Sequence, residues 1–524
     1  MMPKTILILG CGRMQIPALE IARSMGLHVI AADGNPRAEG CHLPHQFLHI
    51  NLIDHEGLLS AAYRIHEERW MDAVFTAGTD FSIAVALIAD ALGLPGHSPA
   101  AATLASDKAQ MRRSFENSQV PSPPFVEVHS DENITAKIQH LPSPWVVKPV
   151  DNMGARGVQR FDAIEQVQEA LECARKHSRT KRVLVESLIE GPEFSLDALV
   201  ENGRMIPCGI ADRHIHHPPH FIEMGHTIPS EFSASKQEAL WDTFEKGIKA
   251  LGLSHGAAKG DIKLSSQGPV ICEIAARLSG GFMSGYTYPY SSGIHPTGSA
   301  IRLALGMKAN FPEPSLKLVC AERALIAIDG TISSIEGMEE ATRLPGVKNL
   351  FFRVRKGDKV SFPRNNIEKI GNIIVTGGTQ RQTHERALRA LRAIQIKLSP
   401  EDPSTGAYLD QKINFPPNAF DLSQDTPGAL SEYLNKLWCA NPPLPSRGGP
   451  AFPPTIYLPP PSPIRDYTGC SISEILVILV RENKIATLPL PSSSITKTGI
   501  LSDFWKALVR GGLCGVRWYL DKRH

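Results

Sequence analysis

The sequence lacks the features that mark disulfide scaffolds and nucleic-acid-binding proteins. Its nine cysteines are scattered, with no C-x-x-C pair and no Cys/His group at zinc-ligand spacing, so we expect a reducing compartment. The formal net charge is only +2, far from the basic excess typical of nucleic-acid binders. Nucleic acid is therefore not expected as a partner of the whole chain.

Long apolar runs are also missing. The N-terminal run Thr5–Leu9 leads into a Gly-Cys-Gly-Arg turn rather than a small-residue cleavage site, so no signal peptide is expected. The apolar run Ile475–Val480 is far shorter than a bilayer-spanning helix. Hydrophobic residues still make up 42% of the 524 residues, which is enough for three to five globular domains. We predict a soluble, cytoplasmic protein with no membrane partner.

The first hundred residues alternate the patterns of strands and helices. Thr5–Leu9 and His28–Ala32 have the continuous apolar character of buried parallel strands. A helical pattern lies between them at Gln15–Met25, and the alternation repeats from Ala73–Thr76 to Ile83–Leu92. This order predicts an α/β domain of the Rossmann-like type over residues 1–100.

That domain imitates a dinucleotide-binding fingerprint without completing it. Gly10 and Gly12 follow the first strand, and Asp33 ends the second, as in nicotinamide-binding proteins. Gln15, however, stands where the third glycine belongs. An oxidoreductase is therefore a rival interpretation that the sequence disfavours.

The remaining chain divides by composition. Residues 101–310 mix strands and long helices, and residues 311–400 alternate short strands with turns before the Arg/Ala/Leu-rich helix Thr383–Ile396. Dense proline between residues 441 and 463 predicts an extended linker over 401–465, because proline has no backbone N–H to donate. Two amphipathic patterns, Ser471–Asn483 and Leu501–Leu513, predict a small helical module over 466–524.

Two stretches have the character of nucleotide-binding segments. Lys148 ends a strand and leads into a loop with Gly154 and Gly157; lysine supplies a charge for phosphate oxygens, and glycine allows close backbone approach. Glu186 ends another strand and Glu193 follows seven residues later, at positions suited to adenine and ribose. Taken alone, each stretch would be better interpreted as an ordinary turn.

A third stretch predicts a metal site. Asp261 and Glu273 lie on two strands joined by a tight Gln-Gly-Pro turn, which should place the two carboxylates side by side. Paired carboxylate oxygens suit Mg²⁺ that bridges nucleotide phosphates. Arg277 follows, where its charge can neutralise a transferring phosphoryl group. The alternative, a charged surface hairpin, is disfavoured by the apolar residues around Glu273.

A fourth stretch combines histidines with a Glu-Met-Gly-His segment. His214, His216 and His217 invite a metal-site interpretation, but their spacing gives no ligand geometry, so a polar surface loop is the preferred prediction. Glu223 and His226 lie in an aromatic and glycine setting that suits a substrate pocket, with the glutamate placed to hold an ammonium group.

The order of these stretches resembles the ATP-grasp superfamily. Leu9–Arg13 and Ala32–Pro36 look like the domain that precedes the grasp, and Phe221–His226 looks like the substrate segment of the carboxylate–amine ligase and L-amino-acid ligase branch. Residues Gly337–Ile396 are similar to the C-terminal lobe of that branch. The resemblance covers about the first 400 residues. It implies an α/β fold with α+β lobes, in which the pre-ATP-grasp domain, an ATP-grasp domain over 101–310, a ligase lobe over 311–400 and a C-terminal module follow one another.

The resemblance also implies roles for individual residues. Lys108 and Lys148 would bind the ATP phosphates under the loop of Gly154 and Gly157, and Glu193 would bind the ribose. The other implied assignments are adenine binding by Glu186, Ser187 and Leu188, Mg²⁺ (or Mn²⁺) binding by Asp261 and Glu273, catalysis by Arg277 and Lys259, and substrate binding by Glu223, His226, Arg277, Gly280 and Gly281.

One residue departs from the family pattern. Many members carry Glu-x-Asn-x-Arg, in which the asparagine is a further metal ligand, whereas this chain has Ala275. The predicted activity is an ADP-forming ligation that joins a small carboxylate, an amino acid by preference, to an amine. The alternative is a non-catalytic nucleotide-binding regulator whose C-terminal module, winged-helix-like or dimerising, binds a partner or nucleic acid. A homodimer is the assembly that the resemblance allows.

Overall fold

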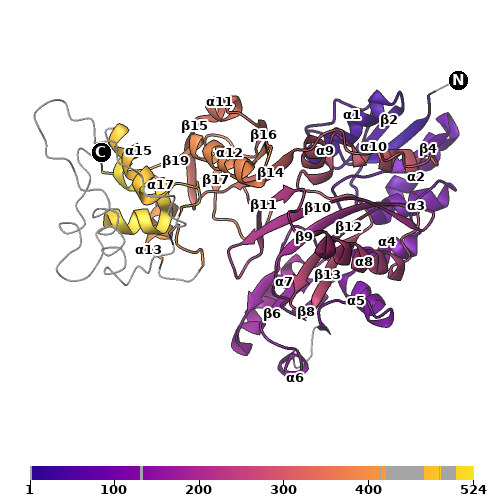
Figure 1. The fold of residues 1–524 in the computed structure, drawn as a ribbon, viewed down its shortest axis with the longest axis horizontal. Helices are drawn as coiled ribbons and strands as arrows, with labels where there is room; N and C mark the ends of the chain where they lie inside the picture. The colour runs from indigo at the N-terminus through magenta and orange to yellow at the C-terminus, as the bar shows by residue number, and fades with distance from the viewer. Residues whose placement is uncertain are drawn as a thin grey trace, which may run out of the picture. The chain divides into compact units, whose positions relative to one another are not determined.

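The chain forms two compact units in the computed structural model, which describes residues 3–129, 134–411, 415–420, 465–482, 484 and 503–523 (Figure 1). Unit 1 contains residues 1–322 and 374–383, and unit 2 contains residues 323–373 and 384–524. The boundaries fall inside β14 (Val319–Leu325), β18 (Gly371–Gly377) and α12 (Gln380–Ala393).

Unit 1 begins with a four-stranded parallel sheet in the order β3-β2-β1-β4. The prediction of buried strands from the apolar runs is confirmed, since all five residues of β1 are buried. The strands are β1 (Thr5–Leu9), β2 (His28–Asp33), β3 (Gln46–His49) and β4 (Met71–Phe75). The helical segments are η1 (Arg13–Gln15), α1 (Ile16–Ser24), α2 (His55–Arg69) and α3 (Ser82–Ala91).

A small antiparallel sheet follows, with the strand order β5-β8-β6-β7. Helix α7 packs on it and buries an apolar stripe of Val167, Ala170, Leu171 and Ala174. The strands are β5 (Phe125–Val128), β6 (Trp145–Pro149), β7 (Gln159–Phe161) and β8 (Val183–Ser187). The helices are α4 (Pro99–Ser106), α5 (Lys108–Asn117), α6 (Ile134–Ile138), η2 (Ile164–Gln166) and α7 (Val167–His177).

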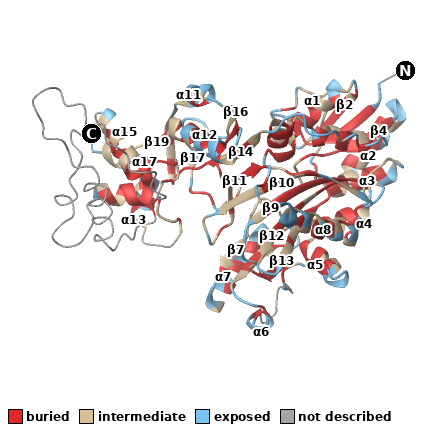
Figure 2. Ribbon diagram, in the orientation of Figure 1, coloured by how far each residue is buried: buried red, intermediate tan, exposed pale blue. Residues whose placement is uncertain are grey.

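A larger antiparallel arrangement completes unit 1, with strands in the order β13-β12-β9-β10-β11. Its central strand β9 is buried over seven consecutive residues (Figure 2), and α8 packs on β12 and β13 (Figure 1). The strands are β9 (Glu193–Glu201), β10 (Arg204–His216), β11 (Ile222–Ile228), β12 (Gly256–Ser265) and β13 (Gly268–Ala275). The helices are α8 (Ala234–Ala250), η3 (Met283–Thr287), α9 (Tyr288–Ser292) and α10 (Pro296–Ala304).

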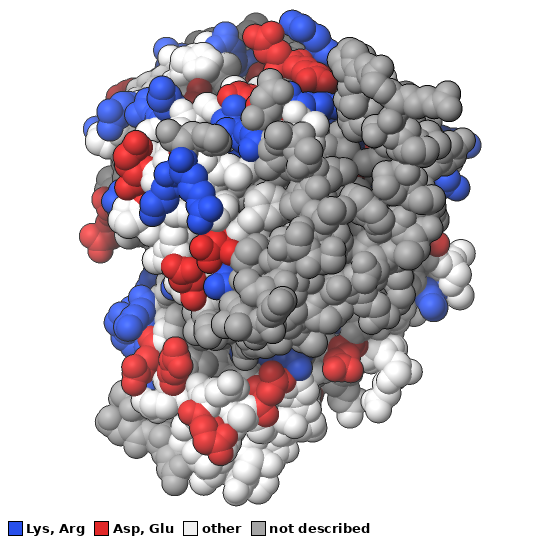
Figure 3. Space-filling view, turned by 90° about the vertical axis from the view of Figure 1, so that its left-hand side faces the viewer, with Lys and Arg blue, Asp and Glu red and all other residues white. Residues whose placement is uncertain are grey.

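Unit 2 contains a sheet of order β17-β15-β19 and a helical core built from α15 and α17. The strands are β15 (Gly330–Glu336), β16 (Val347–Phe352), β17 (Lys359–Val360) and β19 (Gln395–Leu398). The helices are α11 (Met338–Arg343), α13 (Pro403–Asp410), α15 (Ile472–Arg481) and α17 (Asp503–Asp521). On the face drawn in Figure 3, the Lys and Arg side chains of described residues are interspersed with Asp and Glu.

The C-terminal region differs from the sequence prediction in two places. Helix α13 lies inside the range for which a linker was predicted, while residues 421–464 of that range lie outside the described residues. Helix α17 consists of two helical segments that meet at a kink at Gly512, whose backbone is non-helical (φ 59°, ψ −148°). Glycine adopts this positive φ without steric cost. The first segment therefore ends beside the predicted end at Leu513, and the second segment, which continues to Asp521, was not predicted.

No helix among the described residues combines the length and apolarity that a membrane crossing requires.

Candidate active site

The β12–β13 hairpin places Asp261 directly opposite Glu273, which confirms that the two carboxylates lie side by side. Asp261 Oδ2 accepts from Lys259 and lies 3.0 Å from Arg213 Nη1. Asp261 Oδ1 is buried and has no hydrogen-bond partner among the described atoms. A buried carboxylate oxygen without a donor is costly, and a metal ion at this point would satisfy it.

Lys108 links the second carboxylate to the predicted phosphate loop. Asp107 caps α5 by accepting from Ala109 and Gln110 N–H groups, so Lys108 stands at the first turn of the helix. Its Nζ lies 3.0 Å from Glu273 Oε1 and donates to the Asn152 carbonyl at 2.8 Å.

Charges around Glu273 and Lys108 offset the effect of burial on both. Burial acts to raise the pKa of Glu273, but Lys108 and Lys259 hold that pKa below its usual range. Burial likewise acts to lower the pKa of Lys108, yet Glu273 and Asp80 raise it. Both groups therefore stay charged at neutral pH.

Lys148 is held by a closed group of buried charges. Its ammonium pairs with Glu186, whose other oxygen accepts from Arg112 Nε at 2.6 Å. Arg112 also donates to the Cys272 carbonyl on β13. Burial acts to raise the pKa of Glu186, but Arg112 and Lys148 lower it overall. The Glu186 side chain thus fixes Lys148, while its predicted contact with adenine stays a prediction.

Two backbone groups of the predicted adenine segment already have partners. Ser187 N–H donates to the Pro124 carbonyl at 3.0 Å, and Leu188 N–H donates to the Pro144 carbonyl at 2.8 Å. These bonds fix the course of the chain after β8. A contact from this segment to a base would therefore use atoms other than these two N–H groups.

The glycine loop after β6 has the backbone that its sequence predicts. Gly154 and Gly157 have φ values of 69° and 71°, which lie in the left-handed region that favours glycine. A Cβ atom at Gly157 would also meet His177 Cβ at 2.9 Å. The loop therefore depends on glycine at this point for both reasons.

Arg213, for which no role was predicted from the sequence, connects three of the predicted site carboxylates. On β10 it lies opposite Glu193 of β9. Its guanidinium lies 2.5 Å from Glu193 Oε1, 2.9 Å from Glu223 Oε2 and 3.0 Å from Asp261 Oδ2. Burial acts to lower the pKa of Arg213, but Asp261, Glu223 and Glu193 hold it well above the usual value. Sequence alone could not reveal this, because the partners come from three other strands.

His226 is engaged at both ring nitrogens. Nε2 lies 2.7 Å from Thr287 Oγ1, and Nδ1 lies 3.6 Å from Glu322 Oε2. The ring is buried, so it orients neighbouring groups in this conformation, and its predicted contact with a substrate remains a prediction. The loop prediction for the nearby histidines was wrong for two of them, since His214 and His216 belong to β10.

A cavity of about 350 Å³ opens beside these residues. Arg160, Arg213 and Lys263 bring positive charge to its wall, and Phe221 brings an aromatic ring. Lys263 Nζ donates to the Ile189 carbonyl at 3.0 Å, which joins β12 to the chain between β8 and β9. Glu190 and Glu193 also line this cavity, so its wall carries charges of both signs beside the aromatic ring.

The N-terminal sheet contributes a loop that sequence reasoning missed. The Gln15 side chain, fully buried, accepts from Ala77 N–H at 3.0 Å and donates to the Ala77 carbonyl and to Thr79 Oγ1. The Gln15 side chain holds the loop around Gly78, and this loop lies close to the Gly280–Gly281 pair. A Cβ atom at Gly280 would meet the Gly78 carbonyl oxygen at 2.8 Å. The same loop carries Asp80, whose charge acts on Lys108 and Arg156.

The loop that follows Arg277 is also held by Asp197. Ser279 donates to Asp197 Oδ1 through its N–H at 2.7 Å and its hydroxyl at 2.8 Å. Burial raises the pKa of Asp197 to about 6. With Gly280 held against Gly78, this loop has little freedom to shift.

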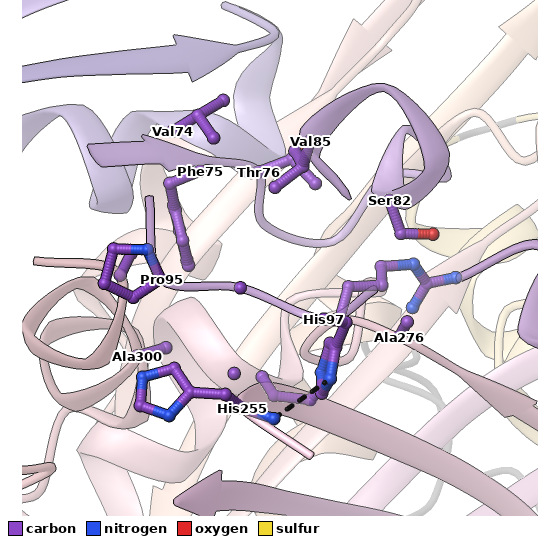
Figure 4. Close-up of a pocket in the computed structure, with 15 residues that line it drawn as sticks. Val74, Phe75, Thr76, Ser82, Val85, Pro95, His97, His255, Ala276 and Ala300 are labelled. Carbon is purple, nitrogen blue, oxygen red and sulfur yellow. Dashed lines mark hydrogen bonds between the residues drawn. The ribbon is translucent and has the colours of Figure 1, made fainter. Parts of the chain in front are cut away.

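Arg277 is one of the residues that line a second cavity, of about 50 Å³, which is drawn in Figure 4. Ser82 of α3 and the His97 and His255 rings line it, and the His255 N–H donates to His97 Nδ1 at 3.3 Å. The Arg277 Nε is buried without a hydrogen-bond partner among the described atoms. Arg277 Nη1 donates to the Leu278 carbonyl at 3.1 Å.

The donor set fits a magnesium ion better than a softer metal. Asp261 and Glu273 supply hard carboxylate oxygens from adjacent strands, as Mg²⁺ prefers. Among described residues, no group of three or more His, Cys, Asp and Glu side chains is placed to hold a metal ion. Ala275, which replaces the usual asparagine, is buried at the end of β13 and offers no donor.

Three family models match consecutive parts of the chain. The ATP-grasp N-terminal domain matches residues 19–96, the ATP-grasp domain matches residues 141–285, and the L-amino acid ligase C-terminal domain 2 matches residues 323–399. The order is that predicted from the sequence.

Individual relatives are distant but extensive. Uncharacterized protein y4rH from Sinorhizobium fredii is 23% identical over 389 residues, covering 73% of this chain and 80% of that protein. Carnosine synthase 1 from Homo sapiens is 23% identical over 342 residues, covering 59% of this chain but only 40% of the synthase. The crystal structure of L-amino acid ligase from Bacillus licheniformis has a TM-score of 0.66 at 22% identity, covering 76% of this chain and 100% of that one, which shows a shared fold. The chain therefore belongs to the ATP-grasp superfamily, in the carboxylate–amine ligase branch that includes the L-amino acid ligases.

Proposed function

We propose that the protein uses ATP to join a small carboxylate, an amino acid by preference, to an amine. The observation that carries the proposal is the pairing of Asp261 with Glu273 beside Lys108 and Lys148. Such a site can collect the phosphates of a nucleotide and a divalent ion at one point. The domain matches and the names of the relatives support the same reaction class.

The nucleotide end of the site is assigned to the space between the small sheet and strands β9 to β12. Lys148 is rigidly placed by Glu186 for phosphate oxygens, and Lys108 is placed beside Glu273. The larger cavity, with Phe221 and Lys263 in its wall, accommodates the nucleoside part beside Glu193. Asp261 and Glu273 would hold Mg²⁺, which would supply positive charge against the negative charge that develops on the phosphates.

The reaction that fits these groups has two steps. A carboxylate oxygen attacks the γ-phosphorus, the bond to the β-phosphate oxygen breaks, and ADP leaves. The amine nitrogen then attacks the acyl carbon of the acyl phosphate, loses a proton, and inorganic phosphate departs. Arg277 and the backbone at Gly280 and Gly281 are assigned to the acyl phosphate, since donors fixed before the reaction stabilise developing charge without reorganising.

Specificity is assigned to the other end of the site. Glu223 lies on β11 beside Arg213, where its carboxylate would accept from the ammonium group of an amino acid. A free α-amino group on the activated substrate is therefore the expected preference. Lys259, which pairs with Asp261, is assigned to assist catalysis beside the metal ligands.

The test measures ADP and phosphate release from Mg-ATP with pooled amino acids, other small carboxylates and amines, and identifies condensed products by mass. Glu273→Gln is the matched control, because it keeps shape and hydrogen bonding but removes the charge. Release that depends on an amino acid and is lost in Glu273→Gln would support the proposal. Tight ATP binding without release in any pool would refute it and favour a nucleotide-binding regulator.

A further inference from the structure

Arg213 holds together groups that the proposed reaction must separate. Its guanidinium contacts Glu193, Glu223 and Asp261, to which the preceding assignments give the ribose, the substrate ammonium and the metal. All four side chains are largely buried, with exposures of 12% for Arg213 and 9–18% for the carboxylates. No solvent ion can readily replace one of them, so their mutual pairing matters more than it would at a surface.

Arg213 is one of the cations that offset the carboxylates at this point. Glu193, Glu223 and Asp261 carry three negative charges, and Arg213, Lys259 and Lys263 carry three positive ones within 4 Å of them. A divalent cation that arrives alone at Asp261 meets Arg213 and Lys259 on the same carboxylate oxygen. Repulsion between like charges at such distances in a partly buried site opposes binding of the free metal.

The second oxygen of Asp261 shows where the metal would enter. Oδ1 is buried and without a hydrogen-bond partner among the described atoms, whereas Oδ2 holds both cations. Arg213 can leave Oδ2 and still keep Glu223 through its other terminal nitrogen, since Nη2 contacts Glu223 and Nη1 contacts Asp261. The forked guanidinium therefore allows one partner to be exchanged while the other is retained.

We propose that Arg213 is an exchangeable counter-ion that keeps free divalent metal out of the site until a nucleotide brings the metal in. The nucleotide phosphates add negative charge beside Asp261, which offsets the repulsion from Arg213 and Lys259. Asp261 then exchanges the Arg213 contact for the metal, and Arg213 stays tied to the substrate carboxylate Glu223. Metal entry and the arrangement of the amino-acid pocket are coupled through this one side chain.

This inference rests on the proposed metal ligands, and metal binding tests it without any turnover. Mn²⁺ binding is measured by electron paramagnetic resonance with the full-length chain, with and without ADP. The wild type should bind Mn²⁺ weakly alone and more tightly with ADP. Arg213→Gln should bind Mn²⁺ alone at least about tenfold more tightly than the wild type, and the difference should shrink when ADP is present.

Arg160→Gln is the matched control. Arg160 lines the same cavity but pairs with Asp162, so its loss should leave the nucleotide-free Mn²⁺ affinity within about twofold of the wild type. Arg213→Lys covers the case in which Arg213→Gln does not fold. The lysine ammonium keeps the positive charge but lacks the planar fork with which the guanidinium reaches three separate carboxylates, so we expect about a threefold gain in affinity for Mn²⁺ alone.

Two results separate failure of this inference from failure of the proposed function. If the wild type binds Mn²⁺ with ADP, but neither Arg213 variant gains affinity for Mn²⁺ alone, the counter-ion role is wrong and the metal site stands. If no protein binds Mn²⁺ even with ADP, the assignment of Asp261 and Glu273 fails, and the inference falls with it.

Discussion

Buried charges occur in both units, and they are satisfied in different ways. In unit 1 they pair with one another and converge on one place, as in the Arg112–Glu186–Lys148 group and the contacts of Arg213. In unit 2, the buried Asp466 instead fixes the chain: it accepts from the N–H groups of Thr468, Cys470 and Leu513. The first pattern leaves charges that a ligand can compete for, whereas the Asp466 carboxylate is occupied by backbone donors.

The arginines of the two units show the same contrast. Arg510 is almost fully buried and donates to the Pro416 and Tyr408 carbonyls, so it ties α17 to the segment around α13. Arg213 donates to carboxylates that are assigned to ligands. Burial alone therefore does not mark a functional charge; the nature of its partner does. Substitutions in the two units should accordingly affect different quantities.

The largest effect is expected from Arg277→Lys in unit 1. Loss of the planar guanidinium removes donors aimed at the acyl phosphate, so kcat should fall about 10²- to 10³-fold. The melting temperature should stay close to that of the wild type, because the hydrogen bond that Arg277 makes among the described residues goes to the neighbouring Leu278 carbonyl. Initial rates of ADP release and a thermal melt decide the matter; an unchanged kcat would place the phosphoryl-stabilising charge elsewhere.

Asp466→Ala in unit 2 should lower the stability of the protein rather than its kcat. Three backbone N–H groups lose their acceptor in a buried site, so the free energy of unfolding should fall by about 3 kcal/mol. Asp466→Asn, which keeps one acceptor oxygen, should lose less than half of that. Urea denaturation gives both values. A stable Asp466→Ala protein would mean that α17 is held by its apolar core alone.

His97 of unit 1 should make the stability of the protein depend on pH. Burial lowers the pKa of His97 to about 4, whereas an unfolded histidine titrates near 6.5. The unfolded chain binds the proton more readily, so stability is lost as pH falls from about 6.5 to 4, by up to about 3 kcal/mol. His97→Gln should flatten this part of the denaturation-versus-pH curve. An equal slope in both proteins would show that His97 is not the responsible group.

The smallest effect is expected from Gln15→Ala. The 77–79 loop would lose the side chain that holds both its N–H and carbonyl, and kcat should fall about tenfold while the KM for ATP changes little. Gln15→Asn keeps the amide but shortens its reach, so its kcat should lie between those of the wild type and Gln15→Ala. If Gln15→Ala changed stability alone, the loop would have no part in positioning the site.

The sequence predicted the parts of the site that depend on local geometry. Asp261 and Glu273 could be paired because a short hairpin leaves one register in which they meet. The parallel strands of the N-terminal sheet could likewise be predicted from their continuous apolar runs. The histidines of β10 were misread because polar residues on a solvated strand resemble a loop.

The contacts that span the fold could not be predicted. Arg213 meets carboxylates from β9, β11 and β12, and their directions depend on the packing of four strands. Gln15 appeared only as a missing glycine, although its amide holds a loop more than sixty residues away. Side-chain reach across a sheet is set by tertiary structure, which composition and spacing do not encode.

The path of the chain through the two units affects the order in which they can be completed. Residues 374–383 belong to unit 1, yet they are made after residues 323–373, which belong to unit 2. On a ribosome that adds roughly 5–20 residues per second, the first 322 residues wait on the order of several seconds for their last segment. Unit 1 is thus completed only when part of unit 2 has already left the exit tunnel. A fragment that stops at Glu322 should consequently show a less cooperative unfolding transition than one that continues through Thr383.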